Sequence, residues 1–98
     1  MAIEIQVETA EDFQDLIDNK DFRISKAIVD GILSNLTTKK KYVHVLSIVC
    51  MEDGEIYDIT VDRKFFADTL DENLKYYIEN EQYEDCQRIV EAMASLKK

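Results

Sequence analysis

The segment Tyr42–Asp62 reads YVHVLSIVCMEDGEIYDITVD, and the rest of the chain is arranged around it. Its two halves are rich in β-branched and aromatic residues, and Asp53-Gly54 stands between them. This dipeptide is the one best suited to a tight two-residue turn, so the stretch predicts a β-hairpin. A hairpin alone is marginally stable in water, and the rest of the chain must therefore cover it.

A two-residue turn also fixes the register of the hairpin, in which His44 faces Arg63. Side chains alternate between the two faces of a strand. One face, which we expect to be buried, carries Leu46, Ile48, Cys50, Tyr57, Ile59 and Val61. The other face of the first strand is also apolar, and includes Val43 and Val45, whereas the second strand alternates. This contrast predicts a central strand beside a more exposed one.

Periodicity outside the hairpin predicts a third strand and four helices. Residues 2–8 alternate strictly, which is typical of a short, half-buried strand. Apolar residues recur at helical spacing over about residues 10–19, 22–36, 63–79 and 82–96. We expect one α+β domain over residues 1–98 with the order β-α-α-β-β-α-α. In it a small antiparallel sheet of three strands, with the hairpin 42–62 at its centre, packs against about four helices. The last two helices form a C-terminal helical hairpin over residues 66–98.

Four residues carry local expectations. Thr9 and Asp62 precede helical patterns and are of the types that cap helix N-termini. A capping pattern at Thr69 allows the third helix to restart there. Gly31 lies inside the second helix, where glycine costs about 1 kcal/mol relative to alanine. The simplest compensation is a close approach of a neighbouring element at that point.

Charge and cysteine content limit the classes of partner. The chain has 98 residues and a formal net charge of −9, which disfavours non-specific binding to nucleic acid and to anionic membranes and suits a basic partner. Cys50 and Cys86 stand within a strand and a helix, and we interpret both as small buried hydrophobic residues in a reducing cytoplasm. No apolar run reaches the roughly 18 residues that a membrane span needs, so no membrane partner is expected.

The one departure from the acidic balance is a basic cluster at the open end of the hairpin. Its members are Lys39, Lys40, Lys41, His44, Arg63 and Lys64. Converging cations of this kind can hold a phosphate, a nucleotide or an RNA backbone. They also solubilise strand ends and guard them against edge pairing, which is the alternative interpretation.

The patterns for catalytic, cofactor and metal sites are missing from the sequence. His44 and Cys50 are too far apart along one strand to chelate a metal, and two cysteines make half a structural zinc site. The acidic residues around the turn lack the spacing of a calcium loop. We therefore expect no catalytic residue, no cofactor and no metal.

Residues 74–96, LKYYIENEQYEDCQRIVEAMASL, resemble the UVR motif. The shared features are an apolar first helix, Tyr83-Glu84 at the turn, then Cys86, Ile89, Met93 and Leu96. Val90-Glu91 stands where that family usually has Arg-Asp. The UVR motif is a short helical hairpin of bacterial excision-repair proteins and of some protease-chaperone adaptors, in which it mediates protein–protein contact. The whole chain is also similar in character to small accessory proteins of large tailed phages.

These observations favour a non-enzymatic protein–protein interaction module that works in the cytoplasm. Its partner is expected to contact the helical hairpin at Tyr76, Tyr77, Tyr83 and Glu84, although the tyrosines are equally suited to sealing that hairpin onto the sheet. A homo-oligomer formed through the helical hairpin or a free strand edge is a further expectation. The alternatives are a nucleic-acid-binding accessory protein that uses the basic cluster, an acidic inhibitor that mimics nucleic acid, and a small enzyme.

Overall fold

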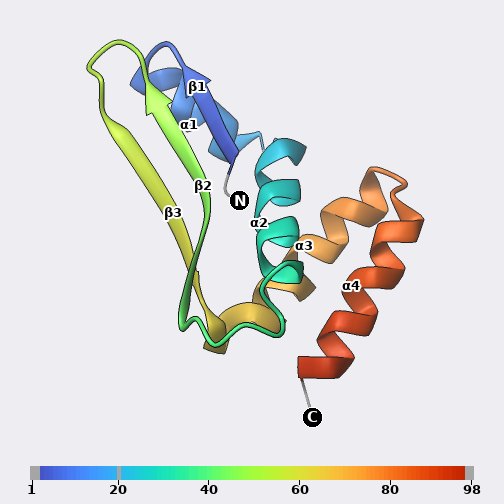
Figure 1. The fold of residues 1–98 in the computed structure, drawn as a ribbon. Helices are drawn as coiled ribbons and strands as arrows, with labels where there is room; N and C mark the ends of the chain where they lie inside the picture. The colour runs from blue at the N-terminus through green and yellow to red at the C-terminus, as the bar shows by residue number, and fades with distance from the viewer. Residues whose placement is uncertain (1–2, 20, 97–98) are drawn as a thin grey trace.

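The computed structural model describes residues 3–19 and 21–96 (Figure 1). As the periodicity predicts, it is an α+β structure with three strands and four helices. The elements are β1 (Ile3–Val7), α1 (Ala10–Asp18), α2 (Phe22–Leu33), β2 (Tyr42–Cys50), β3 (Ile56–Asp62), α3 (Phe66–Glu79) and α4 (Tyr83–Leu96). Ala2 of the expected first strand and residues 97–98 of the expected C-terminal hairpin lie outside the described residues.

The sheet is mixed, and the expectation of an antiparallel sheet was wrong for one of its two pairings. The strand order is β1-β2-β3, with β2 in the centre. Strand β1 runs parallel to β2, with Ile3 beside Leu46 and Val7 beside Cys50, while β2 and β3 are antiparallel. Parallel neighbours need a long crossover connection, and α1 and α2 supply it because they carry the chain back to the end at which β1 began.

The hairpin loop has four residues, Met51 to Gly54, and not two. The N–H of Cys50 donates to the carbonyl oxygen of Glu55 (2.9 Å), and the N–H of Gly54 donates to that of Cys50 (2.9 Å). Gly54 has a φ of +73°, a left-handed conformation that favours glycine. The two-residue turn fails because the N–H groups of Met51 and Glu52 donate to β1 and to the residue after it (2.8 and 2.9 Å).

A β-bulge at Val45 explains why β2 is apolar at nearly every position. The four-residue loop moves the pairing by two residues, and the shift between His44 and Leu46 adds one more, so His44 lies opposite Thr60 and not opposite Arg63. The extra residue turns Val43 and Val45 onto the same face as Leu46, where they are 4% and 2% exposed. The expectation that these valines occupy the opposite face was therefore wrong, because regular alternation does not continue through a bulge.

The helices pack on one face of the sheet, and alternate side chains of the other face are exposed. The core includes Ile5, Ile48, Phe66, Leu70 and Ile89. On the opposite face Glu4, Gln6, His44, Asp58 and Thr60 are exposed to solvent.

Gly31 allows α2 to lie close to β2, as the sequence predicts. A Cβ atom built on Gly31 would stand 3.0 Å from the Cβ of Val45 and closer still to its Cγ1. Helix α2 lies between the sheet and the α3–α4 pair in Figure 1. This placement makes α2 the element on which both halves of the molecule pack.

The expected helix caps at Thr9 and Asp62 are present. The Thr9 hydroxyl accepts a hydrogen bond from the N–H of Asp12 (3.1 Å), at the start of α1. The Asp62 carboxylate accepts from the N–H of Lys64 (3.0 Å) and caps a 3₁₀ turn, Arg63–Phe65, that leads directly into α3. Helix α3 is continuous through Thr69, whereas α2 ends three residues earlier than expected, at Leu33.

The α3–α4 pair and the hairpin extend the molecule in different directions (Figure 1). The principal extents are 45 × 31 × 18 Å, and the radius of gyration is 14.0 Å. A compact domain of this length has a radius of gyration of about 12–13 Å. The elongated shape leaves the sheet edges and the groove described below accessible.

Candidate functional site

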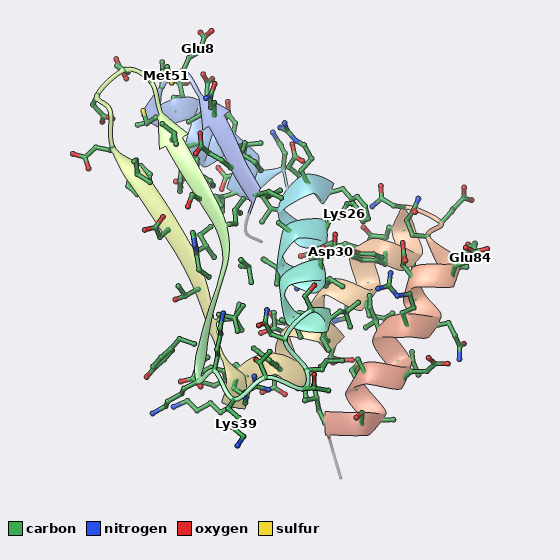
Figure 2. The ribbon with its side chains drawn as sticks, viewed as in Figure 1. Glu8, Lys26, Asp30, Lys39, Met51 and Glu84 are labelled. Carbon is green, nitrogen blue, oxygen red and sulfur yellow. The ribbon has the colours of Figure 1, made fainter. Side chains whose placement is uncertain are left out.

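The basic cluster predicted from the sequence assembles in part. The N–H of Arg63 donates to the carbonyl oxygen of Lys41 (2.7 Å), which fixes the start of β2 beside the end of β3. Lys39, Lys40, Lys41 and Lys64 are all exposed at this end, and Figure 2 shows the Lys39 side chain pointing away from the body of the molecule. The four lysines therefore form the accessible part of the cluster.

Arg63 is a structural member of this end. Its Nε donates to the carbonyl oxygen of Lys40 (2.7 Å), and its Nη2 donates to the carbonyl oxygen of Asn35 (2.8 Å) and to the hydroxyl of Thr38 (3.0 Å). The guanidinium carbon also lies 4.9 Å from the centre of the Phe66 ring. These contacts commit the guanidinium to holding the connection between α2 and β2, so it has few donors left for an external anion.

His44 belongs to a different group of side chains. Its Nε2 lies 2.8 Å from the hydroxyl oxygen of Ser47, and that hydroxyl donates to the carboxylate of Asp58 (2.7 Å). Because Ser47 donates to Asp58 and not to His44, the histidine does not activate the hydroxyl as it would in a catalytic triad. Regular alternation would place positions 44 and 47 on opposite faces, so only the bulge at Val45 brings them together. Sequence reasoning missed this trio for that reason.

Two exposed aromatic rings flank the lysines, and sequence reasoning also missed them. Tyr42 and Phe65 are 58% and 50% exposed. The Nζ of Lys41 lies 5.4 Å from the centre of the Tyr42 ring, and that of Lys64 lies 5.1 Å from the centre of the Phe65 ring. The sequence did contain a signal for them, because Tyr42 directly follows Lys41 and Phe65 directly follows Lys64. Exposed rings beside cations are typical of surfaces on which nucleic-acid bases stack.

The residues expected to contact a partner on the helical hairpin are divided between the surface and the core. Tyr77 is 2% exposed, and its ring packs against Phe22 with ring centres 4.8 Å apart. Burial raises the pKa of Tyr77 well above its ordinary value. Tyr83 is 63% exposed, and Glu84 is exposed at the far end of the helical pair in Figure 2. Tyr76 is half-buried and lines a groove beside α3.

This groove lies between α1, α2 and α3 and has a volume of about 350 Å³. Small-molecule pockets and the pockets that receive anchor side chains of partners begin near this size. It is lined by Leu16, Ile17, Asp21, Ile24, Ser25, Ile28, Glu72, Asn73, Lys75 and Tyr76. The aliphatic members form the walls, and Ile17 is 42% exposed at the surface of α1. We call this feature the α1–α2–α3 groove.

The floor of the groove contains a buried, neutral polar pair. Ser25 and Asn73 are 4% and 7% exposed, and the Ser25 hydroxyl donates to the Asn73 Oδ1 (2.6 Å). The Asn73 Nδ2 in turn donates to the carbonyl oxygen of Thr69 (2.8 Å). These bonds leave one N–H of Asn73 and lone pairs on the Ser25 hydroxyl and the Asn73 Oδ1, so the pair keeps one donor and spare acceptor capacity. The sequence signal was a polar residue at a core position of each helix, Ser25 next to Ile24 and Asn73 between Leu70 and Tyr77.

The rim of the groove is charged. Asp21 caps α2 by accepting from the N–H of Arg23 (2.9 Å), and its carboxylate also accepts from the guanidinium of Arg23 (3.1 Å for each oxygen). These hydrogen bonds hold the pKa of Asp21 below its ordinary range, although burial opposes the shift. Glu72 and Lys75 of α3 stand on the other side. The rim thus presents fixed charges around an apolar interior.

Comparison of the chain with protein-family models, with curated proteins and with solved structures found no match. The resemblance of residues 74–96 to the UVR motif therefore stays a prediction, although α3 and α4 do form a helical hairpin.

The described residues contain no group of three or more histidine, cysteine or acidic side chains placed to hold a metal ion. No helix in residues 3–19 and 21–96 has the length and apolarity of a bilayer span. Of the described residues that line the α1–α2–α3 groove, none is a histidine or a cysteine. The chemistry that the groove offers is therefore apolar contact, neutral hydrogen bonding and rim charge.

Proposed function

We propose that the chain is a small, acidic, non-enzymatic protein-interaction module that receives a short segment of a partner protein in the α1–α2–α3 groove. The observation that carries this proposal is the combination of aliphatic walls with the buried Ser25–Asn73 pair at the floor. Ligand-binding pockets usually combine a mostly apolar lining with a few polar groups that fix the orientation of the ligand.

The chemistry of the groove defines the occupant. Walls of leucine and isoleucine favour one aliphatic or aromatic anchor side chain, which the groove's volume of about 350 Å³ accommodates. The Ser25–Asn73 pair keeps one donor and spare acceptor capacity, which suits a neutral amide such as the backbone next to that anchor. The net charge of −9 favours lysine or arginine on either side of the anchor, because a field of that sign attracts basic segments.

Two features beyond the groove agree with this proposal. Helix α3, which supplies Glu72 to Tyr76 of the groove, is also the first helix of the pair that resembles the UVR motif, a motif that mediates protein–protein contact. Cys50 and Cys86 are free thiols, which suits the reducing cytoplasm. At the floor of the groove, the hydroxyl of Ser25 donates to the neutral amide of Asn73 and not to a histidine or a carboxylate, which favours binding over catalysis.

A peptide selection tests the proposal. A random peptide library displayed on phage is selected against the wild-type chain, and the enriched peptides are measured against two variants. Ile17→Glu places a charge on the groove wall, and Ile78→Glu makes the same change at an isoleucine of similar exposure (42% and 49%) outside the groove. We expect peptides with an apolar anchor between basic residues, at least about 10-fold weaker binding to Ile17→Glu, and unchanged binding to Ile78→Glu. A selection without a consensus, or peptides that bind Ile17→Glu as tightly as the wild type, would overturn the proposal.

A second candidate function is binding of single-stranded nucleic acid at the basic end. The observation that favours it is the pairing of Tyr42 with Lys41 and of Phe65 with Lys64 (5.4 and 5.1 Å). Fluorescence anisotropy with a labelled oligonucleotide at low salt tests it. Binding that weakens steeply with salt and disappears in the triple change of Lys39, Lys40 and Lys41 to serine supports this function, and binding that survives the triple change excludes this site.

A further inference from the structure

Strand β3 leaves one complete edge of the sheet unpaired within the described part of the chain. The strand order β1-β2-β3 places β3 on the outside, as Figure 1 shows. The hydrogen bonds from Cys50 to Glu55 and from Arg63 to Lys41 fix which backbone groups of β3 face β2. Because these groups alternate along an antiparallel strand, the N–H and C=O groups of residues 56, 58, 60 and 62 point away from β2.

This edge has little of the usual protection against pairing. Natural sheets guard their edges with charged side chains, lysine above all, with proline, with bulges or with very short strands, and β3 carries the carboxylates of Asp58 and Asp62. Strand β3 has seven residues, IYDITVD, without lysine, proline or glycine, and the bulge of this sheet lies on β2. Ile56 and Tyr57 are 61% and 40% exposed beside it. The edge is therefore able to add a further strand.

We propose that β3 pairs with β3 of a second copy of this chain, antiparallel and centred on Ile59. In this register Asp58 lies opposite the partner's Thr60, Tyr57 opposite the partner's Val61, and Ile56 opposite the partner's Asp62. The outward-facing groups of the two strands then meet and form about eight backbone hydrogen bonds. The inference is separate from docking at the α1–α2–α3 groove, since it concerns the sheet edge.

Registers that align the outward-facing N–H and C=O groups differ by two residues. Charge repulsion disfavours the two registers next to the one centred on Ile59. A shift of two residues in one direction places Asp58 opposite Asp58 of the partner. The same shift in the other direction places Asp58 opposite Asp62. Directly opposed carboxylates are destabilising. Of these three registers, only the one centred on Ile59 places both outward-facing aspartates opposite a neutral residue, Asp58 opposite Thr60 and Asp62 opposite Ile56.

The same register brings the acidic tip of each copy to the basic end of the other. Residues 8, 52, 53 and 55, all glutamate or aspartate, lie around the hairpin loop, near Met51 and Glu8 in Figure 2. The register places Glu55 of one copy beside Arg63 of the other, and therefore next to the lysine end. Within one chain the two ends are separated by the length of β3, about 23 Å, which exceeds the Debye length of about 8 Å at physiological salt. The two charge patches thus complement each other only between copies.

Opposite charge changes at one position test the pairing. In Thr60→Asp each copy gains an aspartate opposite the partner's Asp58, and in Thr60→Lys each copy gains a lysine there. Sedimentation equilibrium from about 10 μM to about 1 mM measures the dimer dissociation constant. We expect Thr60→Asp to raise it and Thr60→Lys to lower it, each by about 2- to 30-fold, because two symmetric cross-strand charge pairs change together.

Matched controls separate the edge effect from net charge. Gln6→Asp and Gln6→Lys make the same charge changes at an exposed position of β1, and neither should move the constant by more than about 2-fold. In the wild type, exchange of the Asp58 and Thr60 amide hydrogens should also slow as concentration rises, which needs no variant to fold. A chain that stays monomeric at about 1 mM, a constant that shifts in the same direction in both Thr60 variants, or amide exchange independent of concentration would overturn the proposal.

Discussion

Replacing Gly31 by alanine tests how closely α2 approaches β2. In an isolated helix this change stabilises by about 1 kcal/mol, because alanine has the higher helix propensity. Here the new Cβ would stand 3.0 Å from the Cβ of Val45 and closer to its Cγ1. Val45 is 2% exposed and stiff at χ1, so it has no space into which to rotate. Overpacking of this kind costs about 1–3 kcal/mol.

The two effects oppose each other, and the steric one is the larger. We expect Gly31→Ala to lower the free energy of unfolding by up to about 2 kcal/mol, measured by urea denaturation and far-ultraviolet circular dichroism. The double variant with Val45→Ala supplies the control. Val45→Ala alone should cost about 2 kcal/mol through the cavity that it leaves. In the double variant the alanine at position 31 occupies part of that space, so the double loss should be at least about 1 kcal/mol smaller than the sum of the single losses.

Two results would refute this reasoning. A Gly31→Ala variant that is more stable by about 1 kcal/mol would show that helix propensity acts alone and that α2 does not touch β2 at this point. Strictly additive losses in the double variant would show that positions 31 and 45 are not in contact.

Three further outcomes follow from the contacts described above. Arg63→Met should lower the free energy of unfolding by about 2–3 kcal/mol, since several carbonyl oxygens lose a charged donor, while Lys64→Met should change it by less than about 0.5 kcal/mol in the same urea titration. Burial raises the pKa of Tyr77 above its value in the unfolded chain, which is about 10. The neutral phenol therefore contributes its full stability below about pH 10, and this contribution is lost as pH rises further. Tyr77→Phe should lose less stability between about pH 9 and pH 11 than the wild type. Hydrogen bonds with Arg23 lower the pKa of Asp21 below its value in the unfolded chain, which is about 4. The carboxylate therefore stabilises the fold above about pH 4, and this stability is lost as pH falls through the pKa of the folded chain. Asp21→Asn should flatten the decline of stability between about pH 5 and pH 3, and an unchanged slope would contradict this.

Much of the architecture could be predicted from local patterns in the sequence. The helical stripes, the Thr9 and Asp62 caps and the close approach at Gly31 depend on neighbours within a few positions, or on the cost of a single glycine. These features were predicted from residue types because their physical causes are local. The central position of β2 was also predicted correctly, although the structure gives a different reason for its apolar sequence, since the bulge turns Val43 and Val45 onto the helix-covered face.

Features that depend on a third element were not predictable from the hairpin alone. The loop at Asp53-Gly54 has four residues because the N–H groups of Met51 and Glu52 donate to Val7 and Glu8. The hairpin sequence contains no pattern that predicts these hydrogen bonds. The wider loop and the bulge at Val45 together moved His44 away from Arg63, and the bulge brought it to Ser47 and Asp58, which separated the expected basic cluster.

The α1–α2–α3 groove was also not predicted, because its shape depends on the angles between three helices. Its polar floor did leave a signal in the sequence. Ser25 and Asn73 occupy core positions of their helices, and a buried polar residue needs a partner, which each provides for the other.

The most direct test of the account is an isoleucine-methyl spectrum of the chain titrated with a peptide from the selection. The isoleucines report on the groove at Ile17, Ile24 and Ile28, on the β3 edge at Ile56, and on the outer surface of α3 at Ile78. Binding in the groove should shift the three groove methyls and leave those of Ile56 and Ile78 at their positions. Shifts at Ile78 or Ile56 with unmoved groove methyls would contradict binding in the groove.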